Sequence, residues 1–139
     1  MKIKKFELEP FISYLHSLRL DRVDSRMRSR FKKILIDKYQ VFTDELREIN
    51  VDYTVKDSSG DPIIENDKWI FENNDERLKE IQDLSFEEIY IEQNEENKKM
   101  LLSVKESVLN RGPSELEGKD ADVYDCLAEI VEQITYEDQ

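Results

Sequence analysis

The stretch that decides the fold spans residues 25–55 and reads SRMRSRFKKILIDKYQVFTDELREINVDYTV. Apolar side chains recur in it every three or four residues, which is the period of one face of an α-helix. The members of this apolar seam are Met27, Phe31, Leu35, Tyr39, Phe42, Leu46, Ile49 and Tyr53. The spacing predicts a single helix of about 30 residues and about 45 Å. A seam that long exceeds one small core, so part of it must meet a partner helix from this chain or from another copy.

The residues before this stretch predict a shorter first helix. Residues 6–20 space their apolar side chains three and four apart, as one helical face requires. Residues 21–25 interrupt that pattern, and their side chains suit a helix start. Asp24 or Ser25 is therefore the expected cap of the long helix.

Turn-forming residues at 56–62 end the long helix. The apolar segments 63–64 and 69–71 flank a turn at Asn66 and Asp67, which predicts a small β-hairpin. A short helix is expected next, with its cap at Asn73, Asn74 or Asp75.

The remaining residues predict one strand and two helices. Residues 86–92 alternate apolar and polar side chains in part, which indicates a strand with one face in water. Asn94 is the expected cap of a helix that ends before Gly112. A last helix is expected over residues 119–136.

Together these elements predict one domain over residues 1–139, of the α+β class and mostly α. The long helix is expected to pack on the two C-terminal helices, with a small β-hairpin or sheet beside them. With 3 Gly and 3 Pro in 139 residues, the chain has few breaks, which favours long helices over an all-β fold.

The composition excludes several classes of protein. The single cysteine, Cys126, rules out an intramolecular disulfide and a thiolate metal cluster. No apolar run approaches the ~20 residues that cross a bilayer, and the first ten residues do not resemble a signal peptide. We therefore expect no membrane association, no cofactor and a cytoplasmic location.

Charge is distributed unevenly along the chain. The formal net charge is −12, yet residues 1–40 contain 11 basic and 5 acidic residues. On one continuous helix, five basic side chains in this part would fall within about 80° of arc, at 100° per residue. This basic ridge consists of Arg19, Arg22, Arg26, Arg30 and Lys33. It predicts either a binding surface for an acidic partner or for phosphates, or a solvated helix face balanced by nearby carboxylates.

Arg28 is different, because its position projects onto the apolar side of the long helix. Three interpretations remain open at this point. The side chain pairs with a buried carboxylate, anchors a partner protein, or extends from the helix end to reach water.

No catalytic or metal site stands out. His16 is the only histidine, and Cys126 has no basic neighbour in sequence to activate it. The acidic residues 120–125 lack the glycine and distal glutamate of a calcium loop. The acidic surface suggests an alternative function, because its negative charge resembles that of a nucleic acid and could occupy the nucleic-acid site of an enzyme.

Four segments resemble an uncharacterised family of short proteins encoded by phages and prophages of Gram-positive bacteria. They are residues 25–31 (SRMRSRF), 96–110 (ENKKMLLSVKESVLN), 123–134 (VYDCLAEIVEQI) and the opening 1–20. The resemblance implies an accessory protein that acts inside a bacterial host or in a virion. It implies no activity and brings no functional residues.

The favoured hypothesis is a non-enzymatic accessory protein that binds a host or phage protein through the long helix or its basic end. Self-association along the apolar seam, giving a homo-oligomer, is compatible with this hypothesis. Three alternatives remain: a nucleic-acid-binding regulator that uses the basic ridge, an acidic inhibitor of a host defence enzyme, and a virion assembly factor.

Overall fold

The computed structural model describes residues 1–137 and contains five α-helices, one 3₁₀ helix and four short strands in that range. In chain order they are β1 (Lys2–Lys4), η1 (Lys5–Glu7), α1 (Leu8–Ser17), α2 (Arg22–Asp52), β2 (Ile64–Glu65), β3 (Lys68–Trp69), α3 (Asn74–Ser85), β4 (Glu88–Tyr90), α4 (Glu95–Asn110) and α5 (Gly118–Glu132). The predicted α+β class, mostly α, is confirmed.

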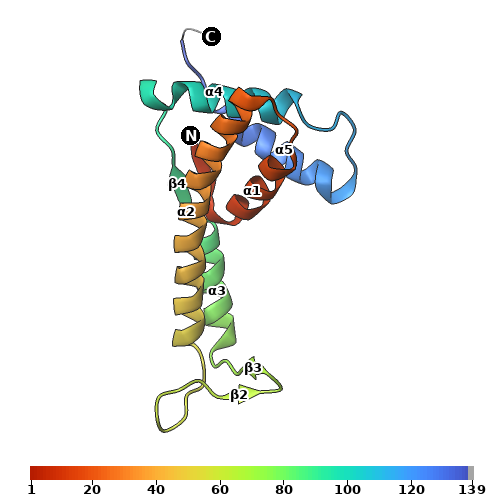
Figure 1. Cartoon of the computed structure of the whole chain (residues 1–139). Coiled ribbons are helices and arrows are strands. Elements are labelled where there is room, and N and C mark those ends of the chain that lie inside the picture. Colours follow the sequence, from red (N-terminus) through yellow and green to blue (C-terminus); the bar gives the residue numbers. More distant parts are fainter. Residues whose placement is uncertain (138–139) are drawn as a thin grey trace.

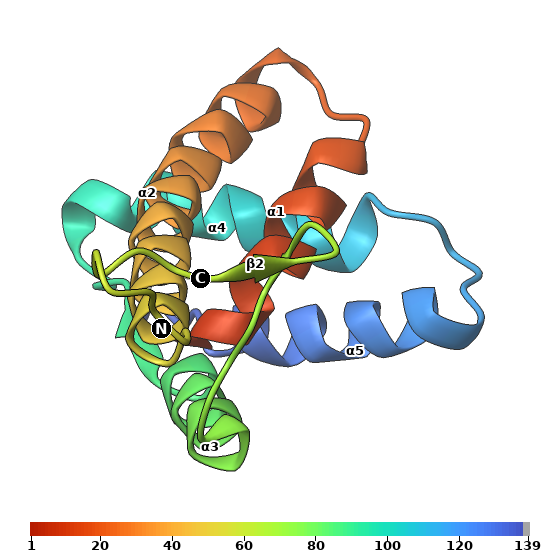
Figure 2. The ribbon, with the colours of Figure 1, turned by 90° about the horizontal axis from the view of Figure 1, so that it is seen from below.

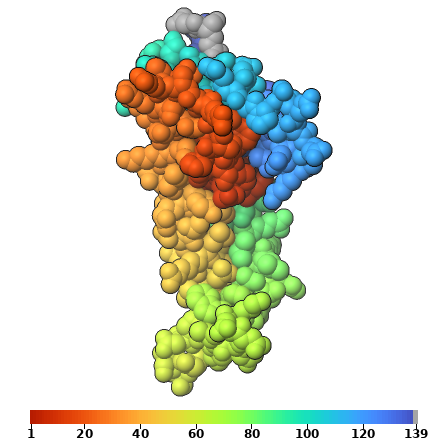
Figure 3. All heavy atoms as spheres, turned by 45° about the vertical axis from the view of Figure 1, so that its right-hand side comes forward, coloured from red at the N-terminus to blue at the C-terminus, as the bar shows by residue number. Residues whose placement is uncertain are grey.

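The long helix α2 belongs to two parts of the molecule (Figure 1). Its N-terminal half packs against α1 and α4, and α4 in turn packs against α5; we call this part the head. Its C-terminal half packs against α3, and we call this pair with the β2–β3 hairpin the stalk. Figure 3 shows the stalk as a narrow extension of the broader head, and Figure 2 looks at the head from the stalk end.

The hydrophobic core lies in the head. The α2 side chains Met27, Phe31 and Leu35 are buried there, as the apolar seam requires. The Phe31 ring lies 5.4 Å from the ring of Phe11 on α1. Each large apolar side chain that leaves water completely contributes about 1.5–3 kcal/mol. The other fully buried members of the core are Ile3, Leu8, Leu15, Leu101, Val104, Val108, Leu127, Val131 and Ile134.

The stalk covers part of the remaining seam, whose residues Leu46, Ile49 and Tyr53 are only half-buried. Phe42 of α2 and Leu84 of α3 are both buried here. The partner helix that the seam needs is therefore supplied by α3 of the same chain, while self-association through α2 remains a prediction. Lys5 ties the stalk to the head, because its ammonium lies 3.3 Å from Glu45 and 2.8 Å from Glu87.

The start of α2 differs from the expectation. The helix begins at Arg22, and its cap is Asp21, whose carboxylate accepts a hydrogen bond of 2.9 Å from the Asp24 amide. The predicted cap at Asp24 or Ser25 was wrong because the chain turns earlier, in the extended residues between α1 and α2. Asp24 instead accepts a 2.7 Å hydrogen bond from the Ser103 hydroxyl on α4.

Two other local predictions are confirmed. The Asn94 side chain accepts a hydrogen bond from the Asn97 amide at 2.8 Å and caps α4. The turn between β2 and β3 places Asn66 and Asp67 at φ angles of 52° and 64°. Two consecutive positive φ angles define a type I′ hairpin turn, and Asn and Asp accept that conformation better than most residues.

A two-stranded antiparallel sheet joins the N-terminus to the residues before α4. β1 pairs with β4, with Ile3 opposite Ile89 and both side chains buried. The outer edge of β1 is closed by Gln133, whose side-chain amide accepts from the Lys2 N–H at 2.9 Å and donates to the Lys2 carbonyl at 3.0 Å. The strand over residues 86–92 was predicted, whereas β1 was not.

Candidate functional site

Four of the six candidate residues lie on one exposed face of α2. Arg22, Arg26, Arg30 and Lys33 are all exposed and fall within about 80° of arc on the helix. They span 11 residue steps, or about 16 Å along the axis. We call these four side chains the basic face.

The basic face has almost no internal partners. Within residues 1–137, none of its four side chains forms an ion pair with a carboxylate, and the one recorded contact joins the Arg30 guanidinium to the Met27 sulfur at 4.0 Å. Two acidic residues at the start of the helix pair elsewhere, since the carboxylates of Asp21 and Asp24 lie 3.7 and 3.8 Å from the Arg111 guanidinium. Among residues 1–137, no ion pair neutralises any of the four charges of the basic face.

Two exposed apolar side chains, Val23 and Ile36, flank the basic face, and neither was predicted from the sequence. Val23 and Ile36 are 55% and 46% exposed. At 100° per residue they project to opposite sides of the four cations. Their exposure depends on which side of α2 the other helices cover, so the helical period alone could not identify them.

Arg19 does not join the basic face. It is exposed, but it lies in the connection between α1 and α2, outside any helix. The five-residue ridge required one continuous helix from Arg19 to Lys33, and the break between the helices removes its first member.

Arg28 is engaged inside the fold. Its half-buried guanidinium donates hydrogen bonds to the carbonyls of Leu15 (3.1 Å) and Leu18, and to the hydroxyl of Ser25 at 3.3 Å. The carbonyls at the end of a helix have no partner within the helix and carry a partial negative charge. Arg28 adds a cationic donor at the end of α1, where the Leu15 carbonyl also accepts from the Leu18 N–H at 3.3 Å, and thereby links α1 to α2. None of the three interpretations from the sequence describes this role, and we leave Arg28 out of the binding face.

Cys126 and His16, the candidate nucleophile and the candidate base, both contact other side chains of the fold. The Cys126 thiol donates a 2.7 Å hydrogen bond to the Glu7 carboxylate. Burial, and next this hydrogen bond, raises the pKa of Cys126 to about 12, so the thiol is neutral near pH 7. The exposed His16 ring lies 3.0 Å from the Lys32 ammonium. Neither arrangement provides an activated nucleophile.

No family model, curated protein or solved structure matches the chain. Among residues 1–137 no cluster of three or more His, Cys, Asp or Glu side chains is arranged to hold a metal ion. Within the same residues, no helix has the length and apolar character needed to cross a membrane. The basic face is therefore judged on its geometry and charge alone.

Proposed function

We propose that this chain is a non-enzymatic accessory protein of the phage type, which binds an acidic protein partner through the basic face. One observation carries the proposal: four cations stand side by side in a chain of net charge −12, and none of them forms an ion pair with a carboxylate in the part of the chain that the structure describes. An acidic surface on a partner would complement them and accelerate association.

The flanking side chains favour a protein over a nucleic acid. Val23 and Ile36 offer apolar contact area on both sides of the cations, and arginine is enriched in protein–protein interfaces. The basic face lacks the aromatic side chains on which single-stranded bases stack. A nucleic-acid-binding regulator remains the alternative that the experiment must separate.

The proposal is tested with a charge-reversed variant, R22E/R26E/R30E/K33E, whose glutamates are good helix formers. Its matched control is K38E/K56E/K79E/K99E, which makes the same charge change at exposed lysines away from the basic face. Each tagged protein is mixed with an extract of host cells, and bound material is identified by mass spectrometry and by nuclease sensitivity. Circular dichroism verifies that all three proteins keep their helices.

We expect the wild-type protein and the control to retain the same acidic protein, and the basic-face variant to lose it. The complex should weaken as salt is raised, because the contact is electrostatic. Retention of that protein by the basic-face variant would refute the proposal. Nuclease-sensitive material that only the variant fails to bind would instead support the nucleic-acid alternative.

A further inference from the structure

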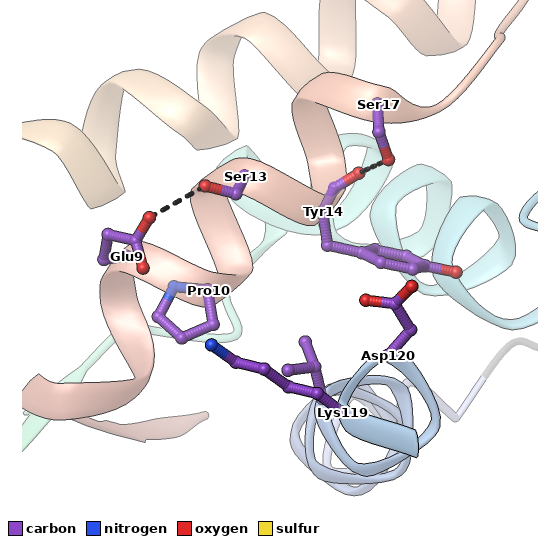
Figure 4. Close-up of a pocket in the computed structure, with 8 residues that line it drawn as sticks. Glu9, Pro10, Ser13, Tyr14, Ser17, Lys119 and Asp120 are labelled. Atoms are coloured by element: carbon purple, nitrogen blue, oxygen red, sulfur yellow. Dashed lines mark hydrogen bonds between the residues drawn. The ribbon is translucent and has the colours of Figure 1, made fainter. Parts of the chain in front are cut away.

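A groove runs between the start of the chain and α5, on a surface separate from the basic face. Two cavities of about 480 and 200 Å³ lie along it and share Pro10, Lys119 and Val123 in their walls. They therefore form one continuous depression, with η1 and α1 on one side and α5 on the other. Figure 4 shows the larger cavity, with Lys119 and Asp120 reaching from α5 toward α1.

The smaller cavity is lined mainly by apolar groups. Phe6, Pro10, Val123 and Leu127 supply most of its wall. Phe6 is 43% exposed, and its ring lies 5.0 Å from that of Phe86, which is 50% exposed. The Phe86 ring continues the apolar lining outward, and the Lys4 ammonium lies over that ring, 5.3 Å from its centroid. An apolar side chain from a partner would exchange water for this lining at about 25 cal/mol per Å².

The borders of the groove are acidic. Glu7 and Glu9 stand on the side of η1 and α1, and Asp120 and Asp122 stand on α5. Lys119 is the one basic residue among the lining residues of the two cavities. Residues 115–137, which include the α5 side of the groove, contain 8 acidic residues and 1 basic residue, so the field on that side is negative.

The carboxylates on α5 remain free for a partner. Within residues 1–137, neither Asp120 nor Asp122 has a hydrogen bond or an ion pair through its side chain. On the opposite border, the Glu9 carboxylate accepts a 2.9 Å hydrogen bond from Ser13 and keeps lone pairs for another donor. The groove thus combines an apolar floor with unneutralised carboxylates on both sides.

We infer that this groove binds a cationic peptide segment of a partner protein, in which an apolar side chain is flanked by Lys or Arg. The apolar side chain enters the smaller cavity beside Phe6, and the basic residues meet the carboxylates of both borders. A second copy of this chain fits less well, although its basic face has the right charge. Binding of the basic face of one copy to the groove of the next would be a heterologous contact, which gives a ring or an open filament rather than the two-fold dimer that is commonest among soluble oligomers.

The test uses a library of random peptides displayed on particles and selected on the full-length protein. We expect the enriched peptides to share an aromatic or branched apolar residue next to Lys or Arg. One enriched peptide is synthesised and titrated against three proteins: the wild type, D120K/D122K, and the control D125K/E129K. The control reverses two exposed carboxylates on α5 that do not line the two cavities. The groove variant should lose about tenfold in affinity, and the control should stay within about twofold of wild type.

Three results would overturn the inference. The first is a selection without enrichment, or with acidic consensus peptides. The second is an equal loss of affinity in D120K/D122K and D125K/E129K, or NMR chemical-shift changes at the basic face instead of the groove. The third is concentration-dependent self-association in sedimentation velocity that D120K/D122K abolishes, because a second copy would then be the occupant. None of the substitutions in this test lies on the basic face, so the groove can fail this test while the proposed function stands, and the reverse.

Discussion

Replacing Arg28 by alanine should destabilise the protein far more than replacing either Arg26 or Arg30. All three arginines belong to the same short segment and differ by at most four positions. Only Arg28 points toward α1. Its guanidinium donates hydrogen bonds to two carbonyls at the end of α1 and to the hydroxyl of Ser25. Arg26 and Arg30 are exposed on the basic face.

The expected cost follows from these contacts. A hydrogen bond to a charged group contributes about 1.5–3 kcal/mol when it is well shielded from water, and a cation at a helix C-terminus contributes about 0.3–1 kcal/mol. Arg28 is half-buried, so water regains part of the carbonyls after truncation. We expect R28A to lower the free energy of unfolding by about 2–4 kcal/mol, which for a chain of this length lowers Tm by about 7–14 °C. R26A and R30A should stay within about 0.5 kcal/mol of wild type.

The measurement is thermal and urea unfolding followed by circular dichroism at 222 nm, which reports on the helices. R28K is the informative intermediate, because an ammonium keeps the charge but loses the planar fork that reaches several acceptors at once. Its stability should fall between those of R28A and wild type. If R28A unfolds within 1 °C of R26A, Arg28 does not hold α1 and α2 together, and our reading of the contact is refuted.

Three further results are expected. Iodoacetamide should alkylate Cys126 of the folded protein slowly at pH 9, because burial, more than any other cause, raises the pKa of this thiol from 9.0 to about 12. The contribution of the neutral thiol to the free energy of unfolding should be lost as pH rises from 9.0 to about 12. E7Q should speed alkylation, because the Glu7 carboxylate helps to raise this pKa. G112A should lower the free energy of unfolding by about 1–3 kcal/mol, because a Cβ at this position would overlap the Tyr14 hydroxyl oxygen. Y14F should relieve this loss in the double variant. Alone it should be nearly neutral, because the buried Tyr14 hydroxyl has no hydrogen-bond partner within residues 1–137. D67G should raise the stability of the hairpin by a few tenths of a kcal/mol to about 1 kcal/mol, because glycine adopts a φ of 64° without strain; amide exchange in residues 63–70 would measure it.

The sequence predicts the elements whose signals are local. The three-and-four spacing from Met27 to Ile49 predicts α2, and the period alone is sufficient because the helix is long. Asn94 caps α4 through its own neighbour three residues on, and the turn at Asn66 and Asp67 needs nothing beyond adjacent residues. Such features depend on contacts between residues that are close together in the sequence.

Features that depend on distant contacts were not predictable. β1 contains one apolar residue, Ile3, and three residues are too short to show a period; its pairing with Ile89 joins opposite parts of the chain. The role of Arg28 depends on where α1 ends in space, because the carbonyls it binds lie 10 and 13 residues earlier. The last helix ends at Glu132, before the predicted Tyr136, since Ile134 enters the core from the following loop.

The candidate site was predictable in part. The helical period alone places Arg22, Arg26, Arg30 and Lys33 on one face. Their freedom from carboxylates could not be read from the sequence, because it depends on where Arg111 and Ser103 meet Asp21 and Asp24. The groove beside α5 carries no motif and arises only from the packing of the chain.

One unbroken helix is shared by the head and the stalk, and this gives the molecule a lever. The part of α2 beyond Ile36 is about 25 Å long, so a tilt of about 10° in the head would displace the C-terminal end of α2 by about 4 Å. The cationic side chains sit at the short arm of this lever, and the exposed Ile64 sits at the end of the long one. A partner that binds the basic face and reorients α2 would therefore also move the β2–β3 hairpin, which it does not contact.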